Sequence, residues 1–76
     1  MPRLPRVTAR EAERAIMKDG WLLISGGGGS HRQYTHSTKA GRVTIAHHAG
    51  RIMKAKTLSG ILSQAGLTVD QFRALL

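Results

Sequence analysis

The chain has 76 residues, a formal net charge of +8 and no cysteine, which excludes disulfide bonds and thiolate metal sites. It contains no run of about 18 apolar residues, the length of a membrane span, and no signal-peptide core follows its N-terminal cations. We therefore expect one small cytoplasmic domain over residues 1–76, in which residues 1–7 form a flexible arm.

The charges are unevenly distributed along the chain. The acidic residues lie towards its ends, at Glu11, Glu13, Asp19 and Asp70. The stretch between Gly20 and Val69 has no carboxylate and contains Arg32, Lys39, Arg42, Arg51, Lys54, Lys56 and all the histidines. A cluster of positive charges attracts polyanions, so we expect a nucleic-acid partner. The alternative, a basic surface that only keeps a small protein in solution, explains a stretch of this length without carboxylates poorly. An anionic membrane is disfavoured because no segment joins basic residues to a large apolar face.

The first expected element is a helix that begins after Thr8. Thr8 and Glu11 have the spacing of a capping box, in which each side chain binds the backbone N–H of the other residue. The apolar side of this helix consists of Ala9, Ala12, Ala15, Ile16 and Met17, and its basic stripe consists of Arg10, Arg14 and Lys18. Gly20 is the expected stop.

Three strands joined as a meander are expected next. Residues 21–24 are apolar and bounded by glycines, which favours a buried strand with Trp21 in the core. Residues 31–36 have strand length, and side chains alternate between the faces of a strand, so His31 points outward if Tyr34 packs inward. A turn leads to a third strand at residues 42–46, where polar and β-branched residues alternate.

Two helices complete the expected fold. A basic loop ends at Thr57, which is expected to cap a helix with apolar residues at Leu58, Ile61, Leu62 and Ala65 and a stop at Gly66. Thr68 and Gln71 repeat the capping-box spacing and predict a short C-terminal helix. The expected architecture is an α+β fold of order α-β-β-β-α with a short helix at its end.

Several segments together resemble one known family. They are Gly20-Trp21, Gly29-Ser-His-Arg-Gln-Tyr34, Gly41-Arg-Val-Thr-Ile45 with His48, Thr57-Leu58 with Ile61-Leu62, and Gln64-Ala-Gly-Leu67. In this order and spacing they resemble the HicA toxin family of toxin–antitoxin pairs, from about Thr8 to the end of the chain. The resemblance implies a fold like the double-stranded-RNA-binding domain, with a three-stranded antiparallel sheet and helices on one face.

The resemblance also implies an activity. HicA proteins are toxins of type II systems, mRNA interferases that cleave mRNA and arrest translation, and a HicB antitoxin neutralises them; the family's key histidine falls on His31. RNA carries its own nucleophile, so a metal is not obligatory, and a histidine can act as the acid or the base. We expect no cofactor. Zinc is disfavoured because His47 and His48 are adjacent and no carboxylate or thiolate completes the shell.

Other residues are expected to assist His31. For a second proton transfer His47, His48 and Tyr34 are available, and we favour His48. Because no carboxylate lies near His31 in sequence, a carbonyl or a hydroxyl such as that of Ser30 is expected to orient it. The candidates for RNA or phosphate binding are Gly28, Gly29, Ser30, Arg32, Tyr34, Arg42, Lys54 and Lys56. The reasons are that the glycine turn and the helix after Thr57 offer backbone N–H groups, and that Arg32 and Arg42 lie on neighbouring strands.

Two alternatives to an endoribonuclease remain open. A non-catalytic double-stranded-RNA-binding module would show shape-selective, salt-dependent binding without product. A protein-only interaction module would associate tightly with a HicB-like protein and have negligible affinity for RNA even at low salt.

Overall fold

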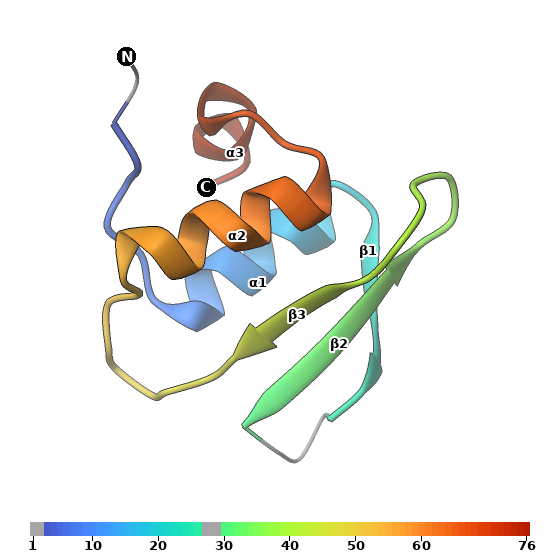
Figure 1. The fold of residues 1–76 in the computed structure, drawn as a ribbon, viewed down its shortest axis with the longest axis horizontal. Helices are drawn as coiled ribbons and strands as arrows, with labels where there is room; N and C mark the ends of the chain where they lie inside the picture. The colour runs from blue at the N-terminus through green and yellow to red at the C-terminus, as the bar shows by residue number, and fades with distance from the viewer. Residues whose placement is uncertain (1–2, 27–29) are drawn as a thin grey trace.

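The computed structural model describes residues 3–26 and 30–76. Their elements are α1 (Ala9–Lys18), β1 (Trp21–Ser25), β2 (His31–His36), β3 (Val43–Ala46), α2 (Ala55–Ala65) and α3 (Val69–Leu75). This is the small α+β fold, in the order α-β-β-β-α with a further short helix, that the sequence predicts (Figure 1).

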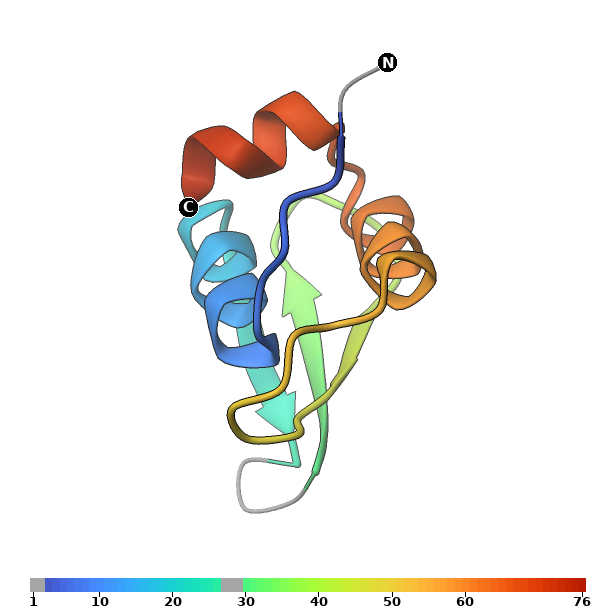
Figure 2. The ribbon, with the colours of Figure 1, turned by 90° about the vertical axis from the view of Figure 1, so that its left-hand side faces the viewer.

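The three strands form one antiparallel sheet in the order β1-β2-β3. In the centre of the sheet Tyr34 pairs with Leu23 on one side and with Val43 on the other. Both α1 and α2 lie on the same face of this sheet, and α3 crosses one end of the pair (Figures 1 and 2). The opposite face carries no helix within the described part of the chain.

The core lies between the sheet and the helices. Its largest fully buried side chains are Trp21, Tyr34, Phe72, Ile16, Ile45, Leu58 and Val43. Burial alternates in β3, where exposed Thr44 lies between buried Val43 and Ile45, because successive side chains point to opposite faces of a strand. In β1 only Trp21 is buried, so the prediction of a buried strand over residues 21–24 was wrong for the residues after Trp21, which lie on the edge strand of the sheet. The prediction that Trp21 belongs to the core is confirmed.

Capping determines where two of the helices begin. At α1 the Glu11 N–H donates to the Thr8 Oγ1 atom at 3.2 Å, and the Thr8 N–H donates to the Glu11 carboxylate at 2.9 Å. Thr68 and Gln71 make the same reciprocal pair at α3. Both capping boxes are confirmed, as is the stop of α2 at Gly66, whose φ of +67° suits glycine.

The inward face of α1 differs from the prediction at one position. Met17 is 44% exposed, whereas Glu13 has a side chain only 13% exposed. The buried set is Ala9, Ala12, Ala15 and Ile16. Glu13 follows Ala9 by one helical turn and continues this face, while Met17 lies one turn further and turns away from the core. The prediction for Met17 was wrong because the face is centred on Ala12.

Two element boundaries also differ. The third strand begins at Val43 and not at Arg42. The second helix begins at Ala55, with Lys54 as its N-cap and no side-chain cap, so Thr57 lies inside the first turn. The Met53 N–H donates to the Val7 carbonyl at 2.8 Å, and this pairing holds the chain in place just before the helix starts. That tertiary contact outweighs the capping preference of Thr57.

The segment before α1 is packed from Arg3 onward. Val7 is buried, Leu4 packs against the core, and the Arg73 guanidinium donates to the Arg3 carbonyl. Residues 3–7 thus make contacts that a flexible arm would lack. Within the described residues no helix has the length and apolar character needed to cross a membrane.

Candidate functional site

His31 is the first residue of β2, and its side chain is exposed. Tyr34, three residues later, is fully buried against the helices, so the alternation of the strand directs His31 to the opposite, open face of the sheet. The exposure of His31 and the burial of Tyr34 agree with the outward orientation expected of His31. The Ser30 Oγ atom lies 3.3 Å from the His31 Nδ1 atom, so Ser30 makes the contact expected of the residue that orients this imidazole.

The chain approaches β2 closely just before this histidine. Gly26 has a φ of +82°, and a Cβ atom built there would lie 1.9 Å from the His31 carbonyl oxygen. Only glycine fits this position, so Gly26 permits its own backbone to pack tightly against the His31 backbone. Gly28 and Gly29, predicted to offer N–H groups to a phosphate, lie outside the described residues.

A polar cluster that the sequence analysis missed lies on the helix-covered side of the same sheet end. The Arg32 Nη1 atom donates to both Glu13 carboxylate oxygens, at 3.2 and 3.0 Å, and the Tyr34 hydroxyl donates to the same carboxylate. The His47 Nε2 atom lies 3.2 Å from the Tyr34 hydroxyl and 3.7 Å from Glu13. These contacts join α1, β2 and the segment after β3 in one network.

The network shifts the titration of its members. Burial alone would raise the pKa of Glu13, but hydrogen bonds from Tyr34 and Arg32 and the charges of Arg32 and His47 outweigh it and lower that pKa. Burial, together with the Glu13 carboxylate, raises the pKa of Tyr34. Burial and the positive charges of Arg32 and Arg10 lower the pKa of His47. The negative charge of Glu13 raises this pKa and so offsets part of the shift. His47 is therefore held mainly as neutral imidazole at pH 7.

Arg32 and Arg42 do not form the adjacent pair expected of them. Arg32 pairs in the sheet with Ile45, and its guanidinium points to the helix side, where it binds Glu13. Arg42 precedes β3, is exposed, and donates from Nη1 to the Gln33 side chain at 3.0 Å. The expectation was wrong because the register brings Arg32 opposite a buried β3 residue, while Arg42 lies beside the open face.

The remaining candidates surround the start of α2. His48 is exposed in the segment after β3, two residues beyond Ala46, the sheet partner of His31. Lys54 is the N-cap of the helix, Lys56 lies in its first turn, and both are exposed. A pocket of about 340 Å³ at this place is lined by Ala9, Ala46, His48, Arg51, Ile52, Met53, Lys54 and Thr57. The structure thus brings His48 and Lys54 to one basic hollow.

The side chains of the described residues do not form a metal cluster. In residues 3–26 and 30–76 no three His, Cys, Asp or Glu side chains gather closely enough to hold an ion.

One pattern in the sequence could have pointed to the Glu13 cluster. Ala9, Ala12, Glu13 and Ile16 have the i, i+3, i+4, i+7 spacing of an inward helix face, and a carboxylate within such a face requires a buried partner. The partners themselves lie 19 and 21 residues away, at Arg32 and Tyr34. Long-range pairing of this kind is not visible in local spacing.

Comparison with known proteins gives one family match for this chain. No curated protein matches the sequence of this chain significantly. Residues 9–67, which span α1 to the end of α2, match the family described as HicA toxin of bacterial toxin-antitoxin systems. The match covers well over half of the 76 residues and includes His31, Arg32, Tyr34 and His48. The chain therefore belongs to the HicA toxin family of bacterial toxin–antitoxin systems.

Proposed function

We propose that this protein is a metal-independent endoribonuclease, the toxin of a type II system, which cleaves mRNA in the cytoplasm through His31 and thereby arrests translation. Membership of the toxin family supports the biological role. The observation that supports the activity most directly is the exposure of the His31 side chain on the open face of the sheet. An RNA strand can reach the imidazole there without displacing any helix.

The proposed reaction uses the nucleophile that RNA provides. The 2′-oxygen attacks the adjacent phosphorus, the bond from phosphorus to the 5′-oxygen breaks, and the products carry a 2′,3′-cyclic phosphate and a 5′-hydroxyl. One group accepts the proton of the 2′-hydroxyl and another donates a proton to the departing 5′-oxygen. His31 performs one of these transfers, and the contact with the Ser30 hydroxyl restrains its ring.

His48 is our candidate for the second proton transfer. His47 and Tyr34, the other groups considered, bind each other and Glu13 on the helix side of the sheet, away from His31. His48 is exposed, and it follows closely after the strand residue that pairs with His31. Among these three groups, His48 is therefore the one that is exposed and takes no part in the Glu13 network.

Exposed basic side chains at two places supply the proposed RNA contacts. Arg42 lies beside the open face, where it binds Gln33, and Lys54 and Lys56 are exposed at the start of α2, on the helix-covered side of the sheet. The formal net charge of +8 strengthens the attraction of all of them for a polyanion. We propose that a HicB-like antitoxin neutralises the protein.

Expression in bacterial cells tests this function. The parent chain should arrest growth and degrade mRNA, and His31→Ala should do neither at an equal protein level. Thr44→Ala is the matched control, because Thr44 is an exposed residue in the strand beside β2 and binds no RNA in our account. Arrest by His31→Ala to the same extent as by the parent would exclude the proposal.

A second function has one specific observation in its favour. Arg10, Arg14 and Lys18 are all exposed along α1, at spacings that place them on one side of the helix. Such a row suits a non-catalytic module that binds double-stranded RNA through its phosphates. This alternative predicts duplex binding that weakens steeply with salt, without any cleavage product, and equal binding by the parent and by His31→Ala.

A further inference from the structure

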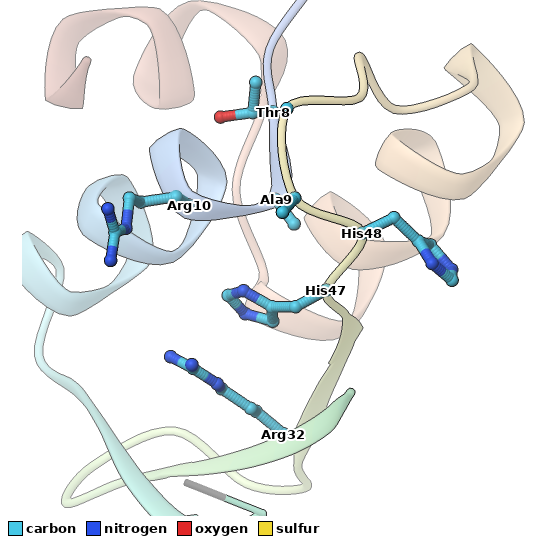
Figure 3. A pocket seen from close by; sticks show the side chains of 8 residues that line it. Thr8, Ala9, Arg10, Arg32, His47 and His48 are labelled. Carbon is cyan, nitrogen blue, oxygen red and sulfur yellow. The ribbon is translucent and has the colours of Figure 1, made fainter. Parts of the chain in front are cut away.

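A pocket of about 300 Å³ lies where α1 begins, on the side of the sheet away from the His31 imidazole. It is lined by Thr8, Ala9, Arg10, Arg32, His47, His48, Ala49 and Gly50. Figure 3 shows Arg32 and the His47 ring extending toward the same space, with Arg10 beside them on the first turn of the helix, whereas His48 points away. Three nitrogen-rich side chains from three separate segments thus converge on one small hollow.

The His47 ring is held in a defined tautomer. The Tyr34 hydroxyl donates its proton to the Glu13 carboxylate, so the Tyr34 oxygen can only accept from the His47 Nε2 atom, 3.2 Å away. The proton of neutral His47 therefore resides on Nε2, and Nδ1 is the acceptor nitrogen. In the described part of the chain Nδ1 has no hydrogen-bond partner. The ring is positioned by one nitrogen and left available for a ligand through the other.

The carboxylates near this pocket are already engaged. Glu13 is bound by Arg32 and Tyr34 behind the pocket wall, and Glu11 is bound by the backbone and hydroxyl of Thr8. Arg10 is exposed and has no carboxylate partner among the described residues. Arg10 and Arg32 carry two positive charges, and Glu13 carries one negative charge. The pocket therefore has a net positive charge even while His47 is neutral.

Arg32 also has unused donors. Its Nη1 atom is the one that contacts Glu13, and its Nε atom is buried without a hydrogen-bond partner. A guanidinium offers five N–H donors in a planar fork, which matches the oxygens of a phosphate. Because Glu13 fixes the position of this guanidinium, little side-chain freedom remains to be lost when an anion binds.

We infer that this pocket binds a phosphate group, with Arg10 and Arg32 as donors and His47 as a third donor once its Nδ1 atom takes up a proton. The group can come from the interior of a nucleic-acid strand or from a terminal phosphate ester, since both present the same oxygens. The site lies on the other side of the sheet from His31, and binding there can be measured without any cleavage. Phosphate binding at this pocket and the proposed ribonuclease activity can therefore each be present without the other.

Titrations followed by NMR of the histidine imidazoles test the site. The ligands are inorganic phosphate, a nucleoside 5′-monophosphate and a short DNA strand without terminal phosphates, which lacks the 2′-hydroxyl and cannot be cleaved by the proposed reaction. At constant ionic strength, we expect at least one ligand to shift the His47 signals in a saturable way. A shift with the DNA strand identifies an internal phosphate, and a shift with the two small ligands alone identifies a terminal one.

Arg10→Ala and Arg14→Ala form a matched pair of variants. Both residues are exposed arginines on α1, and only Arg10 lines this pocket. Arg10→Ala should weaken binding at His47 by about tenfold or more, because a charge-assisted contact is lost, whereas Arg14→Ala should change it less than about threefold. Equal weakening by both variants, or His47 signals that no ligand moves, would overturn the inference. Thermal unfolding of each variant verifies that the fold is intact.

Discussion

Neutralising Glu13 by Glu13→Gln should destabilise the fold near pH 7. The Glu13 side chain is 13% exposed and accepts hydrogen bonds from Arg32 and from Tyr34. Glutamine keeps the size and one acceptor oxygen but removes the charge. Since hydrogen bonds to charged groups contribute about 1.5–3 kcal/mol, the free energy of unfolding should fall by that amount. For a domain of this size the melting temperature should then fall by roughly 10–20 °C.

The destabilisation should depend on pH in a defined direction. The native contacts lower the pKa of Glu13 below its ordinary value of 4.5. A carboxylate with a lowered folded pKa contributes stability that is fully present above 4.5 and is lost as the pH falls through the folded pKa. The gap between the parent and Glu13→Gln should therefore be wide at pH 7 and should shrink as the pH falls below 4.5 and through the folded pKa of Glu13.

Urea unfolding monitored by the fluorescence of Trp21, the single tryptophan, measures this gap. Asp70→Asn is the control, because it makes the same change in net charge at an exposed residue in the first turn of α3. We expect its effect to stay below about 1 kcal/mol. Equal stability of the parent and Glu13→Gln at pH 7, or an undiminished gap in acid, would refute the role assigned to the carboxylate.

Three further predictions concern glycines and His47. Gly60 lies inside α2 with open space around its Cα, so Gly60→Ala should raise the free energy of unfolding by about 0.5–1 kcal/mol in urea titrations, and a loss of stability would contradict this assignment. Gly26→Ala should destabilise by about 1–3 kcal/mol, because its Cβ would strike the His31 carbonyl; unchanged stability and cleavage would exclude that close approach. In NMR titrations His47 should show a pKa below 6.5, owing to burial and the charges of Arg32 and Arg10, so that its contribution to stability is present above pH 6.5 and lost in acid. A His47 pKa above 6.5 would show that Glu13 dominates instead.

The elements with strong local signals could be predicted from the sequence. Thr8 and Thr68 each carry a reciprocal partner three residues later, and a capping box acts within one turn, so both helix starts follow from neighbouring residues alone. The strand from His31 to His36 and the outward direction of His31 follow from the two-residue period of a strand.

The features that could not be predicted depend on contacts between distant segments. The Glu13 carboxylate takes its place on the inward face of α1 only because Arg32 and Tyr34 arrive there from β2 to satisfy it. The second helix starts at Ala55 because the preceding residues pair with the segment before α1, a contact that overrides the local preference for Thr57.

The rate of RNA cleavage in the presence of EDTA measures whether His31 acts without a metal. The purified parent should cleave a messenger RNA with EDTA present and leave 2′,3′-cyclic phosphate ends. His31→Ala should be slower by about 10²–10⁴-fold, the usual contribution of a general acid or base. Its thermal stability should match that of the parent, because the side chain is exposed. Cleavage by His31→Ala at the parental rate would contradict the account.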